Sequence, residues 1–390
     1  MSESPHPLDG LCVLDMSRVL AGPWVGQMLA DLGADVVKLE APGGDDTRGW
    51  GPPFVQGEGG ERLDAAYFHA ANRGKRSVTA DFRTEEGRAL VRDLAARADV
   101  VVENFRAGSL ERQGLGWDDL SAANPRLVWC TITGFGLDGP DAARPGYDYV
   151  IQGMSGIMDL TGEPDGPPTR IGVAFADLFT GLYAANAIQA ALLMRERTGR
   201  GQRIDMALLD TMVAVLANQA QSCLVTGESP RRTGNAHPAI SPYQIIPCAD
   251  FPAIVTVGND AQFERFCGAL GLAGVAQDAR FATNRDRVAN RDALDAIIEA
   301  RSAEIPRAEL LEALDAANVP CGPINTVAQA FEEPQVRHRE MVVDLPHTGE
   351  GPHPYVRTPI RFSEAELRLE RGAPRLDEHG EALRQHGWGD

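Results

Sequence analysis

The sequence has few of the features of a secreted or nucleic-acid-binding protein. Positive charge is scarce, since 37 Lys and Arg stand against 55 Asp and Glu and give a net charge of −18. Nucleic acids and anionic membranes need a broad positive surface, so we expect neither as a partner. Cysteine is also rare, and the absence of C-x-x-C pairs favours reduced thiols over a disulfide framework. The six cysteines are Cys12, Cys130, Cys223, Cys248, Cys267 and Cys321.

Long apolar runs are missing as well. A membrane-spanning helix needs roughly 20 consecutive apolar residues. The best candidate, residues 181–194, is short and contains Asn186 and Gln189. The start of the chain also lacks a basic stretch followed by an apolar one, which argues against a secretion signal. We therefore expect a cytoplasmic protein.

Several common catalytic patterns are absent. The chain has no Ser-His-Asp order, no H-E-x-x-H motif and no Cys/His cluster with metal spacing, so neither a hydrolase nor a metal site is predicted. Residues 134–139 do match G-x-G-x-x-G after a strand-like run. Pro140 and Pro145 follow at once, however, so no helix opens there to receive a dinucleotide pyrophosphate. We interpret these glycines as a loop that brings Tyr147 toward a pocket.

The residues that are present describe an α/β protein with more than one domain. A length of 390 residues with 43% hydrophobic content suggests two or three folding units. The first 135 residues alternate short β-branched runs with amphipathic stretches, which is typical of a doubly wound, mostly parallel, Rossmann-like sheet. Strands are predicted at 11–16, 36–39, 77–82, 100–103 and 127–133, and helices at 26–32 and 85–98, the second capped by Thr84.

A second, smaller α/β region follows the turn-rich segment 226–242. Two strand-like runs precede or alternate with amphipathic helices there, and the tail beyond Pro334 is positioned to return to the first domain. The predicted strands are 244–247 and 254–257, and the predicted helices are 262–270, 291–302, 307–316 and, in the tail, 378–385.

Asp177 is the most informative single residue. It follows an apolar segment and begins a long, alanine-rich stretch predicted to be a helix up to Met194. It is the one carboxylate in this otherwise uncharged region. A carboxylate there is expected to be held ionised by unpaired backbone N–H groups, while apolar surroundings remove its water. Such a group can be a nucleophile, but Asp is also a favoured N-cap. The local pattern does not choose between these two roles.

Two basic clusters can oppose the acidic background at a ligand site. The first is residues 72–76, before one predicted strand, and the second is residues 104–106 with Arg112, after another. Ligands of open α/β sheets bind outside the carboxyl ends of strands, where Arg and Lys can bind phosphate. For each residue taken singly, a solvated loop cation is the alternative. His237 lies in a compact Gly/Pro turn, where it either binds a substrate carboxylate or only supports the loop.

Taken together, these segments resemble the family III CoA-transferases, the formyl-CoA and carnitine CoA-transferase group that also holds the α-methylacyl-CoA racemases. The matching stretches cover nearly the whole chain, and as a set they are specific. They are residues 17–23, 32–40, 45–48, 72–77, 102–106, 146–148 and the segment around Asp177. Within the family, four stretches taken together are most similar to the succinyl-CoA:dicarboxylate branch, which includes glutarate CoA-transferase. They are residues 17–23 with Arg18, residues 45–54, the segment around Asp177 and residues 234–244.

The resemblance implies a covalent route through Asp177 as the catalytic residue. Its carboxylate would form an anhydride with the donor acyl group and then an aspartyl-CoA thioester. CoA thioesters would be substrates, with no permanently bound cofactor, and succinyl-CoA and a dicarboxylate such as glutarate are the expected pair. Expected CoA contacts are Val19, Leu20, Ala21, Asn72, Arg73, Lys75, Asn104, Phe105, Arg106, Arg112 and Tyr147. Expected contacts to the acid are Arg18, Arg48, Tyr147 and His237.

The family also implies an architecture and leaves an alternative. It predicts an interlaced homodimer with a large domain at 1–224, a small domain at 225–330 and a C-terminal segment, 331–390, that returns to the large domain. The racemases carry a histidine where this chain has Tyr147, and a phenol with a pKa of about 10 is a poor base. This favours transfer over racemisation, with a non-catalytic CoA-binding protein as a third reading. The glycine run of formyl-CoA transferases is missing at 233–243, which argues against oxalate or formate.

Overall fold

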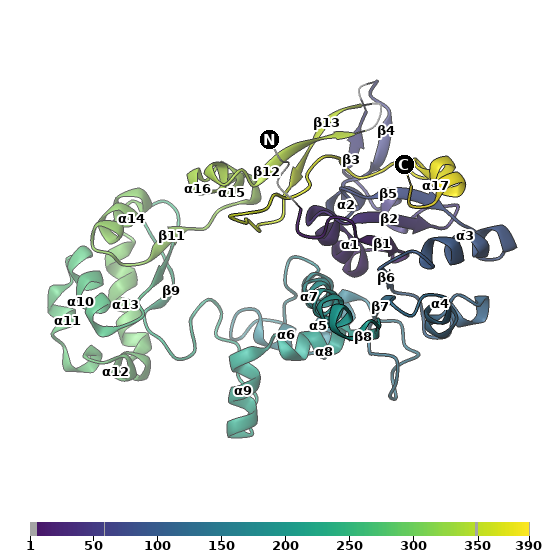
Figure 1. The fold of residues 1–390 in the computed structure, drawn as a ribbon. Helices are drawn as coiled ribbons and strands as arrows, with labels where there is room; N and C mark the ends of the chain where they lie inside the picture. Colours follow the sequence, from purple (N-terminus) through teal and green to yellow (C-terminus); the bar gives the residue numbers. More distant parts are fainter. Residues whose placement is uncertain (1–5, 58, 348–349, 390) are drawn as a thin grey trace. The chain divides into compact units, whose positions relative to one another are not determined.

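The computed structural model describes residues 6–57, 59–347 and 350–389 and divides into two compact units (Figure 1). Unit 1 consists of Met1–Ile157, Arg170–Glu228 and Gln335–Asp390, and unit 2 of Met158–Thr169 and Ser229–Pro334. The predicted α/β class with a mostly parallel central sheet is confirmed. The few residues of the expected ranges 1–224 and 331–390 that fall at 1–5, 58, 348–349 and 390 lie outside the described residues.

Unit 1 is built on a six-stranded parallel sheet. Its strand order is β5-β2-β1-β6-β7-β8, and every neighbouring pair is parallel. Counted along the chain within this sheet, the order is that of doubly wound nucleotide-binding folds, and it reverses between β1 and β6. The strands are β1 (Cys12–Asp15), β2 (Asp35–Glu40), β5 (Arg76–Thr79), β6 (Val100–Glu103), β7 (Val128–Thr133) and β8 (Arg203–Ala207).

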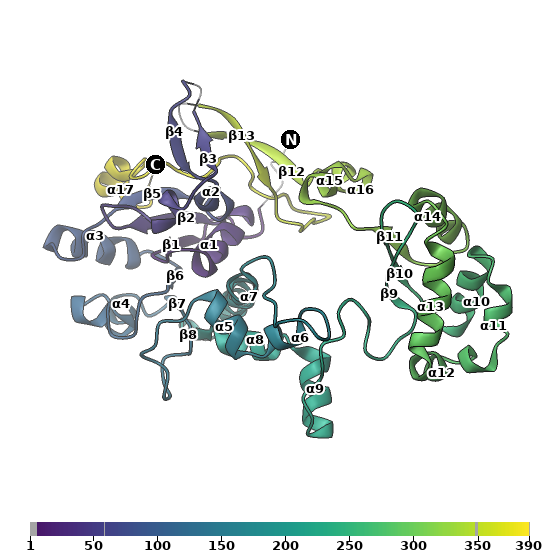
Figure 2. The same cartoon turned by 180° about the vertical axis from the view of Figure 1, so that it is seen from behind.

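Helices cover both faces of this sheet, as the two views together make clear (Figures 1 and 2). Alternate strand residues point to opposite faces, so Val100 and Val102 join one core and Val101 the other. The first core holds residues of α1 (Ala21–Asp31), α5 (Asp148–Met154), α7 (Phe175–Thr198) and α8 (Leu208–Ala214). The second holds residues of α3 (Glu85–Ala95), α4 (Trp117–Ala123) and α17 (Gly380–His386). Burial on both faces explains why the central strands β1, β6 and β7 are mainly apolar.

Helix α1 begins five residues before the predicted start at 26. Pro23 lies in its first turn, where proline is tolerated because the amides of that turn have no intrahelical acceptor. The predicted Thr84 cap is confirmed, because its side chain accepts a hydrogen bond from the Gly87 amide at 3.1 Å.

The C-terminal segment covers the edge strand β5. The backbone of His379 donates to the Ser77 carbonyl at 3.0 Å, and the Thr79 amide donates to Asp377 Oδ1 at 2.7 Å. An edge strand left open presents unpaired backbone groups to other chains, and this segment satisfies them. Two small antiparallel hairpins complete the unit: β3 (Phe54–Gln56) with β4 (Arg62–Ala65), and β12 (Val342–His347) with β13 (Glu350–Val356).

The remaining helices of unit 1 are short or exposed. They are α2 (Ala66–Ala70) and α9 (Ala217–Thr226), and α16 (Pro334–His338) lies at the boundary of the two units. Figure 1 shows α9 projecting from the end of α8, and none of its described residues is buried. Among the described residues, no single helix has the length and apolarity of a membrane span, although the bent pair α8 and α9 passes on length and composition alone.

Unit 2 has its own core around a three-stranded antiparallel sheet. The strand order is β11-β10-β9, made of β11 (Cys321–Pro323), β10 (Ala253–Thr256) and β9 (Tyr243–Ile246). Phe263, Phe266, Leu294 and Leu310 pack in this core. The helices are α10 (Asp260–Ala269), α11 (Ala273–Ala276), α12 (Asn284–Ala289), α13 (Arg291–Ser302), α14 (Arg307–Ala316) and α15 (Val327–Glu332), with α6 (Ile157–Leu160) in the upstream segment.

The unit boundaries differ from the expected domain ranges at an internal segment and by four residues each at 225–228 and 331–334. Residues 158–169 lie within the expected large domain, but they group with unit 2. Arg232 is the physical reason, because its guanidinium donates to the carbonyls of Asp159 and Gly166 and forms an ion pair with the Asp159 carboxylate at 2.9 Å.

Candidate active site

A cavity of about 440 Å³ opens at the carboxyl edge of the parallel sheet. The loops that follow β1 and β6 both line it, so it lies where the strand order reverses, which is the usual ligand crevice of such sheets. Asp177 reaches it from the first turn of α7. The structure brings ten of the residues named from sequence together here: Arg18, Val19, Leu20, Ala21, Asn104, Phe105, Arg106, Arg112, Tyr147 and Asp177.

The loop after β1 is held rigidly against the loop after β6. Asn104 Oδ1 accepts from the Arg18 amide at 2.8 Å, and Asn104 Nδ2 donates to the Arg18 carbonyl at 2.7 Å. Val19 has a φ of 71°, an unfavourable conformation for a β-branched residue. Its amide donates to Asp45 Oδ2 at 3.2 Å. The surrounding hydrogen bonds therefore hold a strained backbone in the cavity wall.

A buried ion pair stands behind this loop. Lys38 Nζ lies 2.9 Å from Asp45 Oδ2 and also donates to the Ser17 carbonyl at 2.9 Å. Burial raises the pKa of the Asp45 carboxyl, but the charge of Lys38 and hydrogen bonds from Thr47 outweigh it and hold that pKa below its usual value. Asp45 is thus kept as a carboxylate that can accept from Val19.

Asp177 is not the N-cap of its helix. Helix α7 begins at Phe175, Ala174 is its N-cap, and Asp177 is its third residue. The Asp148 carboxylate takes the first-turn amides instead, since its Oδ2 lies 2.7 Å from the Ala176 nitrogen and 3.4 Å from the Asp177 nitrogen. The capping role considered for Asp177 is therefore wrong, because another residue fills it.

The expectation that these amides hold Asp177 ionised is wrong for the same reason. Burial raises the pKa of Asp177 to about 7, and the negative charge of Asp148 contributes to the increase. Near neutral pH the group therefore exists in comparable amounts as an acid and as a carboxylate. An elevated pKa is common for groups that perform chemistry in a cleft.

The glycine-rich loop after β7 has the role that was predicted for it. A Cβ atom at Gly134 would lie 2.4 Å from the Gly146 Cα, so the two ends of the loop approach more closely than any side chain allows. Tyr147 follows directly, precedes α5, and lines the cavity with Asp177. The loop therefore brings Tyr147 to the pocket, and within this described segment no helix begins at the glycines, since α5 starts only at Asp148.

Two further side chains were missed by sequence reasoning. Tyr67, on the short helix α2, has its pKa raised to about 12 by burial and by the charges of Asp177 and Asp148, so it remains a hydrogen-bond donor. Trp50 packs edge-on against it with a centroid distance of 5.5 Å. No local pattern marks Tyr67, because its connection to Asp177 is made only through the tertiary fold.

A third missed residue is Arg144, which lines the cavity from the loop before Tyr147. It forms an ion pair with Asp141 at 3.3 Å and lies over the Phe135 ring. In the sequence, Arg144 lies between Pro140 and Pro145 and near several glycines, a pattern that is typical of an exposed loop.

The first basic cluster does not line this cavity, and its predicted CoA contacts need correction. Asn72, Arg73 and Lys75 precede β5 and do not line the Asp177 cavity, whereas the second cluster follows β6 and does. All three side chains are buried. Lys75 Nζ lies 2.7 Å from an Asp15 oxygen and 2.8 Å from Asn72 Oδ1, and Arg73 pairs with Asp31.

Arg48 is likewise enclosed and does not line the cavity with Asp177. Its guanidinium donates to both oxygens of Glu40, at 2.8 and 2.7 Å, and also pairs with Asp64. Its side chain is only 8% exposed. A group whose donors are already taken by carboxylates is not available to a second carboxylate.

His237 lies in unit 2, where its contacts are local. Its Nδ1 accepts from the Ala239 amide at 3.1 Å, its carbonyl accepts from Arg291 at 2.8 Å, and its ring packs near Tyr243. These contacts are those of a residue that supports the turn.

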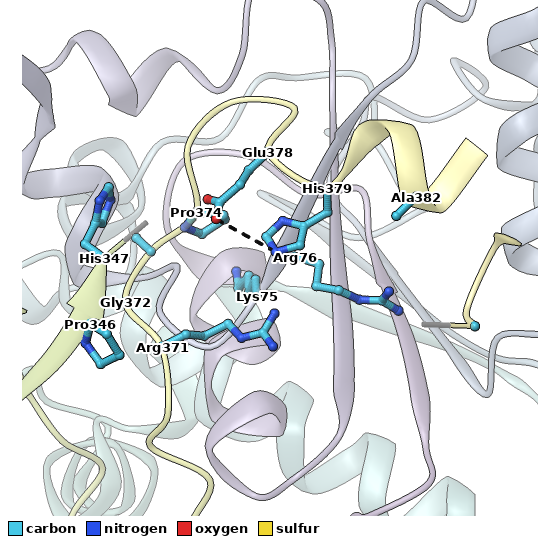
Figure 3. A pocket seen from close by; sticks show the side chains of 12 residues that line it. Lys75, Arg76, Pro346, His347, Arg371, Gly372, Pro374, Glu378, His379 and Ala382 are labelled. Carbon is cyan, nitrogen blue, oxygen red and sulfur yellow. Dashed lines mark ion pairs between the residues drawn. The ribbon is translucent and has the colours of Figure 1, made fainter. Parts of the chain in front are cut away.

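Two other cavities help to define the site. One of about 250 Å³ shares Arg18 and Phe105 with the Asp177 cavity and extends along the carboxyl edge toward Arg83. The other, of about 500 Å³, lies beside the start of β5 (Figure 3). There Glu378 lies 3.9 Å from the His379 ring, near Arg76 and Arg371, and Asp177 does not contribute.

Comparison with known proteins decides the family. Residues 8–380 match the family described as CoA-transferase family III. The chain belongs to CoA-transferase family III. This family III CoA-transferase is 53% identical over 383 residues to the succinate–glutarate CoA-transferase of Agrobacterium fabrum, covering 97% of this chain and 96% of that protein.

Other relatives agree over the same length. The chain is 41% identical over 378 residues to the succinyl-CoA:glutarate CoA-transferase of Mus musculus, covering 97% of this chain and 85% of that protein. A crystal structure of a CAIB/BAIF family protein from Brucella suis matches with 59% identity and a TM-score of 0.88, covering 97% of this chain and 98% of that one. The protein is thus an enzyme whose substrates are CoA thioesters and carboxylic acids.

Proposed function

We propose that this CoA-transferase moves CoA from succinyl-CoA to a dicarboxylate such as glutarate, with Asp177 as the nucleophile. The observation that carries the proposal is the position of Asp177 in a cavity that the loops after β1 and β6 line together. The relatives named for succinate and glutarate support this pair of acids.

The reaction proceeds by exchange of acyl and CoA groups on Asp177. The carboxylate attacks the thioester carbonyl, the carbon–sulfur bond breaks, and a mixed anhydride and CoA thiolate form. The thiolate attacks the aspartyl carbonyl of the anhydride, which releases succinate and leaves an aspartyl-CoA thioester. The acceptor carboxylate then displaces the thiolate to form a second anhydride. The thiolate attacks its acceptor carbonyl, and Asp177 is regenerated with no net transfer of protons.

The two adjoining cavities suit an elongated substrate. Together they run along the carboxyl edge from Asp177 past Arg18 and Phe105. Within the described part of the chain, no carboxylate pairs with Arg106 or Arg112, although the protein carries an excess of acid. Free guanidinium groups at this edge fit the phosphates of CoA.

The acceptor acid needs donors for both of its carboxylates. Tyr67 is a protonated phenol suited to the carboxylate that reacts at Asp177, and Tyr147 lines the cavity together with Asp177. Among the cations expected to bind the distal carboxylate, Arg18 is the one that lines the Asp177 cavity, and Arg144 lines it as well. We assign the distal carboxylate to these two arginines. Unlike Arg48, they form only exposed ion pairs, with Asp46 and Asp141, which water screens and a substrate carboxylate can replace.

The enzyme is proposed to work as a homodimer. Large apolar side chains are exposed on α7 and α9 of unit 1, among them Leu193 at 70%, Leu224 at 80% and Val225 at 75%. Large apolar side chains left exposed in this way are typical of a protein interface. A second copy of the chain would cover it.

The acylation step is expected to depend on pH through Asp177. Only the carboxylate attacks, and burial raises the pKa of Asp177 to about 7. The value of kcat/KM for succinyl-CoA should therefore fall below pH 7, approaching a tenfold loss per pH unit, and level off above about pH 8. Initial rates between pH 5 and 9 test this. A nucleophile with an ordinary carboxyl pKa would give a flat profile over the same range.

A panel of acids tests the substrate assignment. Succinyl-CoA is incubated with glutarate, succinate analogues and matched monocarboxylates, and CoA esters are quantified by mass spectrometry. We expect dicarboxylates to be preferred, and glutarate to be among the best. Strict preference for monocarboxylates would contradict the proposal, and solvent deuterium at the α-carbon without an acceptor acid would indicate a racemase.

A further inference from the structure

The start of the nucleophile helix is capped by a side chain from another helix. The N-cap residue of α7, Ala174, has no side-chain acceptor. Asp148, the first residue of α5, supplies one through Oδ2, which accepts from the Ala176 amide at 2.7 Å and lies 3.4 Å from the Asp177 nitrogen. The Asp177 side chain is thereby left free of any capping role.

Gln152, one turn further along α5, reinforces this arrangement. Its Nε2 donates to Asp148 Oδ1 at 2.7 Å and to the Val173 carbonyl at 3.3 Å, while its Oε1 accepts from the Ile171 amide at 2.9 Å. The Gln152 side chain is fully buried. Both Asp148 oxygens therefore accept hydrogen bonds. Gln152 also connects α5 to the segment just before α7, through Ile171 and Val173.

We propose that Asp148 is a positioning residue for CoA transfer, which binds the first-turn amides of α7 and presents Asp177 to the thioester as an uncapped carboxylate beside a like charge. This inference rests on the proposed role of Asp177. A carboxylate denied helix amides and placed near a second negative charge is more basic, and a more basic carboxylate is a better nucleophile. Asp148 does not touch the reacting atoms in this account.

The other charged groups around Asp177 do not provide the same effect. Burial raises the pKa of Tyr67 on α2 to about 12, so this phenol carries no charge, and Asp177 is the only charged residue of α7 before Arg195. The arginines of the cavity, Arg18, Arg106, Arg112 and Arg144, all oppose the influence of Asp148. Asp31 at the far end of α1 pairs with Arg73, and Asp210 on α8 is exposed.

The test compares Asp148→Asn with the wild type in single-turnover acylation by succinyl-CoA between pH 5 and 9, with the acyl-enzyme trapped by hydroxylamine. Asparagine can still accept from the Ala176 amide but carries no charge. We expect the acid limb to move to lower pH by about half a unit or more. The plateau rate should also decrease several-fold, because the nucleophile is less basic. Asp118→Asn on α4 removes an equal, exposed charge elsewhere and should leave the profile unchanged.

Each outcome decides a separate question. If the wild type forms no acyl-enzyme, the proposed function fails. If it does, and the Asp148→Asn profile has the wild-type midpoint and plateau, only the positioning role fails. Asp148→Ser provides a second uncharged cap if the asparagine variant does not fold. Loss of folding in both variants would also overturn the inference, because Asp148 would then be a structural residue.

Discussion

Replacing Asp177 with asparagine is expected to abolish CoA transfer without damaging the fold. An amide cannot form the anhydride or the aspartyl thioester, so turnover should fall by a factor on the order of 10³ or more. Burial raises the pKa of Asp177 to about 7, so the folded chain holds this proton at a pH where the unfolded chain has released it. Stability contributed by this group therefore decreases as pH rises from about 4 to 7. At pH 8 the neutral variant should melt at an unchanged or higher temperature.

Matched variants separate catalysis from structure. Asp177→Ser and Asp177→Ala should be as inactive as the asparagine variant, because none of them has the carboxylate that forms the anhydride. All three should fold, because Asp148 caps α7 in each of them. Asp118→Asn serves as the control for a change of net charge. Turnover is measured by chromatography of the CoA esters and stability by thermal unfolding at pH 8. Near-normal turnover in any Asp177 variant would refute the covalent mechanism, and a large drop in melting temperature would make Asp177 a structural residue.

The second large effect is expected for Lys75→Met, which should lower the free energy of unfolding of the protein. Lys75 and Asp15 form a fully buried ion pair at 2.7 Å. Burial lowers the pKa of Lys75 to about 8, which shows that the environment opposes its charge even with Asp15 beside it. Lys75→Met leaves the Asp15 carboxylate without this partner. The free energy of unfolding should decrease by about 3–5 kcal/mol.

Denaturant unfolding at pH 7 measures this change. Removal of both charges, with Asp15→Leu added to Lys75→Met, should recover much of the loss, because an apolar pair does not need to be neutralised. Arg83→Met breaks the exposed pair with Asp81 and should change stability too little to measure. A Lys75→Met variant as stable as the wild type would mean that water reaches Asp15 when the lysine is removed.

The accuracy of the sequence predictions depended on how local the underlying signal was. The strand 100–103 and the helices 291–302 and 307–316 were predicted with their observed bounds, because apolar periodicity alone specifies them. Strand β8 and the hairpin of β12 and β13 were missed. Their residues contribute mixed polar and apolar faces, and β8 also pairs with β7, a strand that lies far from it in the chain.

The site was predicted unevenly for related reasons. The residues that follow β1 and β6 line one cavity, as the family resemblance implied, because the carboxyl ends of parallel strands share an edge. The cluster at 72–75 was placed with them because it is basic, lies near a strand terminus and belongs to a matched stretch of the family. In the structure Lys75 and Arg73 form ion pairs with Asp15 and Asp31. A charged residue in a sequence does not reveal which partner neutralises it.

The sequence by itself determined the parallel α/β class, the family and the identity of the candidate nucleophile, because these depend on periodicity and on motifs contiguous in the chain. Only the tertiary structure decided the pKa of that nucleophile and whether it caps its helix. Asp148 reaches Asp177 across 29 residues of chain, takes its helix amides and places a like charge near it. Tyr67, 110 residues away in the sequence, joins the same site. Hydrogen bonds, desolvation and Coulomb interactions act through space, so a pKa and a cap belong to the folded arrangement and not to any local stretch of residues.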